Sequence, residues 1–167
     1  MDVRSAALLV DEYKNAMRHV ASAVAVVTFR DHAGWAGVIT TAICSATTEP
    51  PTLVVCIRND TPAAKLIRAA GVFAVNFLTD EQADIARRFS TSTQTDGTPF
   101  DAAGDWTEGG TGTPVLDGAV SSFECKLEKA FEHGSHDIFL GLVQGLRTAP
   151  GENLLYRDGF FRRLFSE

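Results

Sequence analysis

Short runs of β-branched and other apolar residues, separated by turn residues, recur through most of the chain. The first group occupies residues 23–29, 35–40, 43–47 and 52–57, with Gly34 and the sequence Glu49-Pro50-Pro51 at the breaks. Valine, isoleucine and threonine favour strands, and breaks this short can only join antiparallel neighbours. Many short strands with few helices indicate a closed β architecture rather than alternating strands and helices.

Helices are predicted at the N-terminus and after this first group of strands. Apolar residues recur at helical spacing over 9–20, with charged residues between them, which indicates an amphipathic helix that serves packing. Thr61 is a candidate N-cap before Pro62, and residues 63–70 end at Gly71. A cap, a proline in the first turn and a terminal glycine together predict a short helix.

A third helix is predicted after a strand at 72–78. Thr79 and Gln82 have the spacing of a capping box, and the helix reaches to about Phe89. Residues 90–114 are then rich in serine, threonine, glycine and aspartate. This stretch is longer than most connections inside a compact domain, so we predict a functional loop or a surface for a partner.

The last third of the chain predicts two long strands, at 123–131 and 136–147. Apolar and charged residues alternate in the first of them, so its charged residues are expected to face water. The connecting Gly134-Ser135 is typical of a type II′ hairpin turn, which places His133 opposite His136. A final hairpin is predicted from the apolar runs 154–156 and 160–165.

Length and charge limit the possible partners. The 167 residues fit one domain over 1–167, and the net charge of −6 is spread without a basic run, which argues against nucleic acid and anionic membranes. The chain shows neither a membrane-span stretch nor the apolar core of a secretory signal, so we expect a cytoplasmic protein with a small-molecule partner. Cys44, Cys56 and Cys125 form no metal-ligand pattern, and the last two lie in apolar runs as expected core residues.

Two polar segments could bind parts of one ligand. Residues 58–62 lead into a helix, whose first N–H groups carry a partial positive charge that suits a phosphate, although most helix caps bind nothing. Residues 40–45 offer hydroxyl, thiol and backbone donors that suit a flat polar heterocycle. The common alternative for this second segment is an ordinary edge strand with solvated threonines.

Histidines and glycines provide weaker signals. His133 and His136 flank the tight turn without further ligands at metal-binding spacing, so they are surface residues or hydrogen-bond partners of a bound anionic cofactor. Residues 109–112 are glycine-rich but lack the Lys-Ser/Thr of a phosphate-binding loop, and we predict a flexible loop. The chain also lacks the G-x-G-x-x-G of a Rossmann dinucleotide site.

Taken in order, several segments resemble the flavin reductase family of split-barrel flavoproteins. Three consecutive segments carry most of the likeness: 37–45, 49–57 and 59–67. Further marks follow in the family's order, at 73–78, Gln82, Ala86, Phe89, 114–116, 123–125, Gly134, His136, Gly141 and 155–156. The likeness extends over residues 13–164 and is strongest to the reductase components of 4-hydroxyphenylacetate 3-monooxygenase.

The resemblance implies a mainly β fold, the Greek-key split barrel that binds FMN, with a few peripheral helices. It further implies a homodimer with FMN or FAD lying across the barrel near the subunit interface. NADH or NADPH would transfer a hydride to the flavin N5, and the reduced flavin would pass to a partner flavin-dependent monooxygenase.

The resemblance also implies roles for particular residues. Six residues would line the isoalloxazine and ribityl parts of the flavin: Thr40, Thr41, Ala42, Ile43, Cys44 and Ser45. The phosphate would lie at Asn59, Asp60 and Thr61, with Arg88 and Phe89 bordering it. His136 would position the nicotinamide. The chain departs from the family pattern at Ser135, where many relatives have aspartate, and at Phe160-Phe161, where many have arginine and tyrosine.

Two other functions fit a similar barrel. A flavin-binding sensor or storage protein would share the fold without turnover, because a fold alone does not fix a function. An oxidase of the pyridoxamine-phosphate type would need a cluster of arginine and lysine for the substrate phosphate, and the sequence shows no such run. The reductase is favoured over the sensor by Gly134 with His136.

Overall fold

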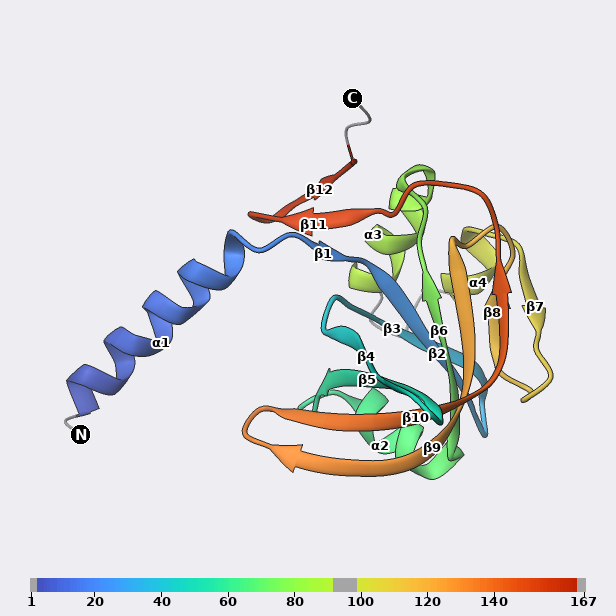
Figure 1. Ribbon diagram of the computed structural model, residues 1–167, viewed down its shortest axis with the longest axis horizontal. Helices are drawn as coiled ribbons and strands as arrows, with labels where there is room; N and C mark the ends of the chain where they lie inside the picture. The colour runs from blue at the N-terminus through green and yellow to red at the C-terminus, as the bar shows by residue number, and fades with distance from the viewer. Residues whose placement is uncertain (1–2, 92–98, 165–167) are drawn as a thin grey trace.

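A single curled antiparallel sheet organises the chain. The computed structural model describes residues 3–91 and 99–164, and its largest sheet has seven strands in the order β3-β2-β6-β9-β10-β5-β4 (Figure 1). These strands are β2 (Ala25–Asp31), β3 (Gly34–Thr40), β4 (Ile43–Thr48), β5 (Pro51–Arg58), β6 (Val72–Phe77), β9 (Ser121–His133) and β10 (His136–Thr148).

The sheet must curl, because strands at its two opposite edges are consecutive in the sequence. β3 and β4 are the edge strands, yet only Thr41 and Ala42 separate them. The Thr40 hydroxyl at the end of β3 donates to the Cys56 carbonyl on β5 at 3.2 Å. This bond links one edge of the sheet to the strand beside the opposite edge. The predicted mainly β architecture with a few helices is therefore confirmed.

Smaller elements complete the molecule. β1 (Ser22–Ala23), β11 (Leu155–Arg157) and β12 (Phe160–Arg162) form one small sheet, and β7 (Trp106–Glu108) and β8 (Pro114–Leu116) form another. The helices are α1 (Val3–Arg18), α2 (Pro62–Ala70), the 3-10 turn η1 (Asp80–Gln82), α3 (Ala83–Thr91) and α4 (Pro99–Ala102). The β11–β12 hairpin confirms the last predicted hairpin within the described residues.

β2 is buried on both faces, which explains why its sequence is apolar without alternation. Its odd-numbered residues Ala25, Val27 and Phe29 enter a core that α2 covers, and Val24 and Val26 enter a second core that α3 covers. The two helices therefore lie on opposite faces of the same strand. Burial of apolar surface on both sides makes this strand the centre of the fold.

A buried asparagine joins four strands of this wall. The Asn76 amide donates to the Val26 carbonyl at 3.2 Å and accepts from the Leu116 N–H at 3.0 Å and the Ser122 hydroxyl at 2.9 Å. It also donates to the Thr28 hydroxyl, at 3.2 Å. Because Asn76 is fully buried, these bonds compensate the loss of its contacts with water.

Glu124 corrects two predictions. The alternation on β9 predicted a water-facing residue, but Glu124 is buried, and it accepts hydrogen bonds from the Thr111 N–H at 2.8 Å and the Thr111 hydroxyl at 2.9 Å. Residues 109–112, predicted to be flexible, are thus anchored to the sheet. Burial raises the pKa of the Glu124 carboxyl, but the bonds from Thr111 and Gly110 outweigh it and hold the pKa below its ordinary value.

Other boundaries differ from the sequence predictions. The strand predicted over 23–29 is divided at Val24, whose N–H donates to the Leu154 carbonyl of the C-terminal segment. The predicted loop over 90–114 contains α4, β7 and the start of β8 within its described part, and residues 92–98 lie outside the described residues. The division at Val24 depends on a residue far along the chain, whereas β7 and β8 pair locally with each other in a stretch whose composition predicts a loop.

Helix α1 extends away from the sheet instead of packing on it (Figure 1). Leu9, Tyr13 and Met17 recur at helical spacing and are 56%, 64% and 47% exposed. The amphipathic helix is confirmed, but the described part of its apolar side, at Leu9, Tyr13 and Met17, stays largely exposed in the single chain. An apolar helical face of this kind normally marks a surface for a partner.

Candidate functional site

The start of α2 and the β9–β10 hairpin form one junction. The Asn59 N–H donates to the Ser135 carbonyl at 3.1 Å, and the Asn59 side-chain amide donates to the Gly134 carbonyl at 3.0 Å. Gly134 adopts a φ of 58°, as the first central residue of a type II′ turn requires, and His133 pairs with His136. The predicted turn is confirmed, and two segments far apart in the sequence meet here.

The first turn of α2 keeps its N–H groups free of side-chain caps. Thr61 occupies the N-cap position with extended backbone, as predicted, but its side chain makes no cap bond. Its hydroxyl donates instead to the Arg58 carbonyl at 2.8 Å. Without a cap, the first N–H groups and the partial positive charge of the helix start remain available to an anion.

Arg58 balances the acidic residue beside this helix start. Its Nε donates to Asp60 Oδ1 at 3.0 Å, and a second bond joins Arg58 Nη2 to Asp60 Oδ2. The hydrogen bond from Arg58 holds the pKa of the Asp60 carboxyl below its ordinary value, and nearby charge on Arg58 and His136 acts in the same direction. Sequence reasoning gave Arg58 no role, although its spacing from Asp60 could have suggested the pair.

His136 begins β10 directly after the turn and is exposed. Its Nδ1 lies 2.9 Å from the Ser135 hydroxyl, and across the sheet it pairs with Arg58 of β5. The pairing with Arg58, which lies just before Asn59 and Asp60, places the histidine near the α2 start. The structure therefore brings together the histidine predicted for nicotinamide and the residues predicted for phosphate.

The six residues predicted to line the flavin ring run from the end of β3 into the edge strand β4. Ala42, Cys44 and Ser45 are exposed, whereas Ile43 packs against the core. The Ala42 carbonyl accepts a bond from the Cys56 N–H at 2.9 Å, and the segment therefore lies beside β5, the strand that leads to Arg58 and Asn59. The segment thus offers edge-strand backbone and small polar side chains on a surface continuous with the α2 start.

Phe89 lies in a different environment from the α2 start. It is buried in the core beneath α3, in aromatic contact with Phe100 and Trp106 at centroid distances of 5.2 and 5.7 Å. A Cβ on Gly37 would lie 2.7 Å from the Phe89 ring, so this glycine of β3 is required by close packing. The contacts of Phe89 are structural, and the neighbouring Arg88 is exposed.

The cysteines differ in exposure. Burial raises the pKa of the Cys125 thiol to about 12, so it remains protonated and acts as the predicted core residue. Cys56 is half-buried, and burial, together with the nearby Cys44, raises its pKa. Cys44 is the exposed thiol of the predicted flavin segment.

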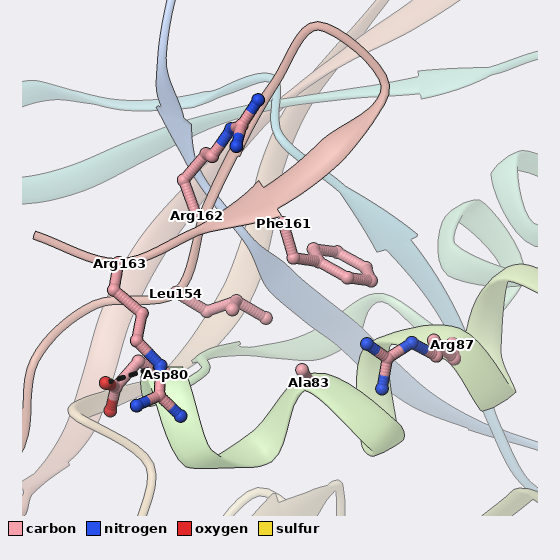
Figure 2. Close-up of a pocket in the computed structure, with 7 residues that line it drawn as sticks. All are labelled: Asp80, Ala83, Arg87, Leu154, Phe161, Arg162 and Arg163. Carbon is pink, nitrogen blue, oxygen red and sulfur yellow. Dashed lines mark ion pairs between the residues drawn. The ribbon is translucent and has the colours of Figure 1, made fainter.

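A separate hollow of 190 Å³ lies between η1, α3 and β12 (Figure 2). The Arg87 guanidinium stacks over the Phe161 ring at 5.6 Å, and Arg163 pairs with Asp80 at 3.3 Å on the other side. The residues around it are Asp80, Ala83, Arg87, Leu154, Phe161, Arg162 and Arg163. The fold thus gathers arginines that are scattered in the sequence, but none of the residues predicted to bind flavin lines this hollow.

Two other site types receive no support from the described residues. None of the helices described is long and apolar enough to cross a membrane. Within the same part of the chain, no group of histidine, cysteine, aspartate and glutamate side chains is placed to hold a metal ion.

Comparison with known proteins decides the family. Residues 17–164 match the family described as the flavin reductase like domain. The chain belongs to this family. The predicted resemblance is confirmed, and with it the split-barrel fold, because the structure superimposes on flavin reductases over nearly its whole length.

Three relatives of this flavin reductase family member illustrate the match. The 4-hydroxyphenylacetate 3-monooxygenase reductase component of Pseudomonas aeruginosa is 35% identical over 91% of this chain and 90% of its own length. The FMN reductase (NADH) RutF of Stutzerimonas stutzeri is 39% identical over 91% of this chain and 87% of its own. The solved NADH:FAD oxidoreductase SgcE6 of Streptomyces globisporus is 29% identical, covers 92% of each chain and has a TM-score of 0.86.

Proposed function

We propose that the chain is an NADH-dependent flavin reductase that works as one domain and supplies reduced flavin to a partner monooxygenase. The observation that carries the proposal is the junction of the uncapped α2 start with the hairpin of His136, joined through Asn59. A reductase must hold a flavin and a nicotinamide against each other. At the junction the uncapped N–H groups of the α2 start, which suit an anion, lie beside His136, which we assign to a second ligand.

The residues around this junction fit a flavin mononucleotide unit. The α2 start offers backbone donors beside Asn59 and Thr61 for the phosphate, and Arg58 compensates the Asp60 carboxylate beside them. The exposed edge at Ala42, Cys44 and Ser45 offers backbone and side-chain hydrogen bonds along a flat ring. We place Thr40, Thr41 and Ile43 in the same segment, with Arg88 and Phe89 as more distant borders.

The protein's contribution to the reaction is binding and orientation. When bound, the nicotinamide supplies the hydride and the flavin accepts it. The α2 start would hold the phosphate end of the flavin, the edge of β4 would hold its ring, and His136 would donate a hydrogen bond that orients the nicotinamide. Alignment of two rings in this way removes most of the entropic barrier to their reaction.

The named relatives guide the choice of cofactors. The RutF relatives are FMN reductases that use NADH, and SgcE6 is an NADH:FAD oxidoreductase, also solved with NAD and FAD fragments. We propose NADH rather than NADPH as the donor of this chain. FMN and FAD share the phosphate and ring that the proposed site would contact, so either can serve.

A homodimer would cover the apolar side of α1. Leu9, Tyr13 and Met17 are exposed on this helix, and the outer face of the sheet presents Phe131, which is 50% exposed, beside Ile138. A second copy offers matching apolar surface at both places. Light scattering should give a dimer mass, and Tyr13→Glu with Met17→Glu should give a monomer; a monomeric unmodified chain would exclude this arrangement.

The decisive experiment is the loss of NADH and NADPH absorbance with purified protein and FMN, FAD or no flavin, in air. Flavin-dependent oxidation, faster with NADH, is expected. Flavin binding without oxidation would identify the sensor or storage protein instead. Transfer to a monooxygenase is tested by coupling, in which the reduced flavin must support product formation by a separately purified 4-hydroxyphenylacetate hydroxylase component.

A further inference from the structure

A buried ion pair joins the last turn of α2 to β10. The Nε and Nη2 atoms of Arg68 both lie 2.8 Å from the same oxygen, Oδ2 of Asp137. The Asp137 side chain is only 5% exposed and that of Arg68 33%. The guanidinium also lies 5.5 Å from the centre of the Phe139 ring, which belongs to the core beneath α2.

The hydrogen bonding of this pair is incomplete. Among the residues that the structure describes, Asp137 Oδ1 is buried without a hydrogen-bond partner, and the buried Arg68 Nη2 makes the ion-pair contact with Oδ2 but no hydrogen bond. A buried pair with unsatisfied atoms adds little to stability, because dehydration of both charges offsets their attraction. Replacement of a buried ion pair by apolar residues of similar size is often neutral or stabilising, so stability alone does not explain the pair.

The location of the pair supplies a different explanation. Asp137 directly follows His136, and Asn59 ties the front of α2 to the turn before that histidine. The helix is therefore attached to the hairpin at its front through Asn59 and at its rear through Arg68. Ala63, Ala64 and Ile67 already hold one side of α2 in the core, and the two polar attachments add direct links from both ends of the helix to the hairpin. These links set the place of the first turn of α2 relative to β10.

We propose that Arg68 and Asp137 are positioning residues of the reductase. Through α2 and β10 their ion pair fixes the proposed phosphate position at the helix start relative to the proposed nicotinamide position at His136. The inference rests on the proposed function and adds two residues that touch neither ligand. Hydride transfer depends steeply on the relative placement of two rings, so a small shift of α2 lowers the rate more than it lowers binding.

The test replaces both charges, Arg68→Met with Asp137→Leu, so that no unpaired charge remains buried. We expect the midpoint of urea unfolding to stay the same or rise, the flavin Kd to change less than about threefold, and kcat to fall about tenfold. A matched control, Arg30→Met with Glu108→Leu, removes an exposed ion pair of 2.8 Å outside α2 and the hairpin, and should leave kcat unchanged. An unchanged kcat in the folded double variant overturns the proposal.

Amide hydrogen exchange gives a second reading that does not depend on turnover. Loss of the rear attachment should speed exchange at residues 59–64 in the double variant and not in the control. If the unmodified protein oxidises no NADH, the proposed function fails, and unchanged exchange at these residues would overturn the positioning role separately. Should the double variant not fold, Arg68→Lys keeps the charge without the two-nitrogen contact, and an unchanged kcat in it also overturns the proposal.

Discussion

Asn76 and Asn59 are the same residue type in two regions of opposite character. Asn76 lies in the wall formed by β2, β6 and β9, where its amide bonds to the Val26 carbonyl, the Leu116 N–H and the Ser122 hydroxyl. Asn59 lies at the partly exposed junction, where its amide bonds to one turn carbonyl. In the wall, polar groups satisfy one another, and at the junction the helix N–H groups beside Asn59 remain available.

Polar groups in the wall therefore act mainly on the stability of the fold, whereas those at the junction act mainly on ligand binding. Removing a polar group from the wall leaves its partners buried without hydrogen bonds, and that penalty is large. At the junction water replaces the lost partner, so the same change affects a ligand more than the fold. The buried wall thus holds the junction in place. At the junction, N–H groups can remain without a protein partner because water can bind them, whereas buried N–H groups without a partner would be costly.

The largest effect is expected from Asn76→Leu. It leaves the Leu116 N–H and the Ser122 hydroxyl buried without their acceptor, and should lower the free energy of unfolding by about 3–4 kcal/mol. Asn59→Leu is the matched variant and should lower it by less than about 1 kcal/mol while weakening flavin binding. Urea unfolding measures both, and equal losses would contradict the division between wall and junction.

Glu124→Gln tests the wall through pH. Because the folded-state pKa of Glu124 is lowered, its carboxylate stabilises the fold above the unfolded-state pKa of about 4.3, and this contribution is lost as the pH falls through the folded value. At pH 7 the variant should be less stable by about 2 kcal/mol, the value of hydrogen bonds to a charged group. The difference in free energy of unfolding between the variant and the unmodified protein, measured by urea titration, should disappear below about pH 4. A difference that stays constant with pH would mean that the charge of Glu124 is not its cause.

Thr61→Pro tests the junction. Proline removes the backbone N–H and the hydroxyl at the α2 start, so the flavin Kd should rise about tenfold, which corresponds to about 1.4 kcal/mol. Thr61→Ser keeps both groups and should bind as the unmodified protein does. Flavin fluorescence titration measures the affinities after thermal unfolding confirms that both variants fold. An unchanged Kd for the proline variant would remove the phosphate from this position.

The sequence predicted local signals well and long-range partners poorly. The glycine with positive φ at the β9–β10 turn, Gly134, and the helix end at Gly71 were predictable because each depends on neighbouring residues. The burial of Glu124 was not, because its partner Thr111 lies in a glycine-rich loop that sequence alone presents as flexible. The same holds for Arg68 and Asp137, far apart in the chain and joined only by the fold.

The candidate site shows the same limit. Family motifs predicted Asn59, Thr61 and His136, and the fold brings them to one junction. They also predicted Phe89 as a border of the phosphate, and sequence alone did not show that its ring packs against Phe100 and Trp106. A motif records which residues accompany a function, and the three-dimensional contacts decide whether each one can touch a ligand or only supports the fold.

His136→Ala should have the smallest effect and separates the two ligands at the junction. Loss of one exposed hydrogen-bond donor should raise the KM for NADH roughly fivefold and leave the flavin Kd unchanged. His133→Ala is the matched control, because His133 pairs with His136 across the same turn, and it should change neither constant. Steady-state oxidation of NADH measures the first constant and flavin fluorescence the second. A weaker flavin complex with an unchanged KM for NADH would move His136 to the flavin side of the site, and the two-ligand arrangement at this junction would have to be reversed.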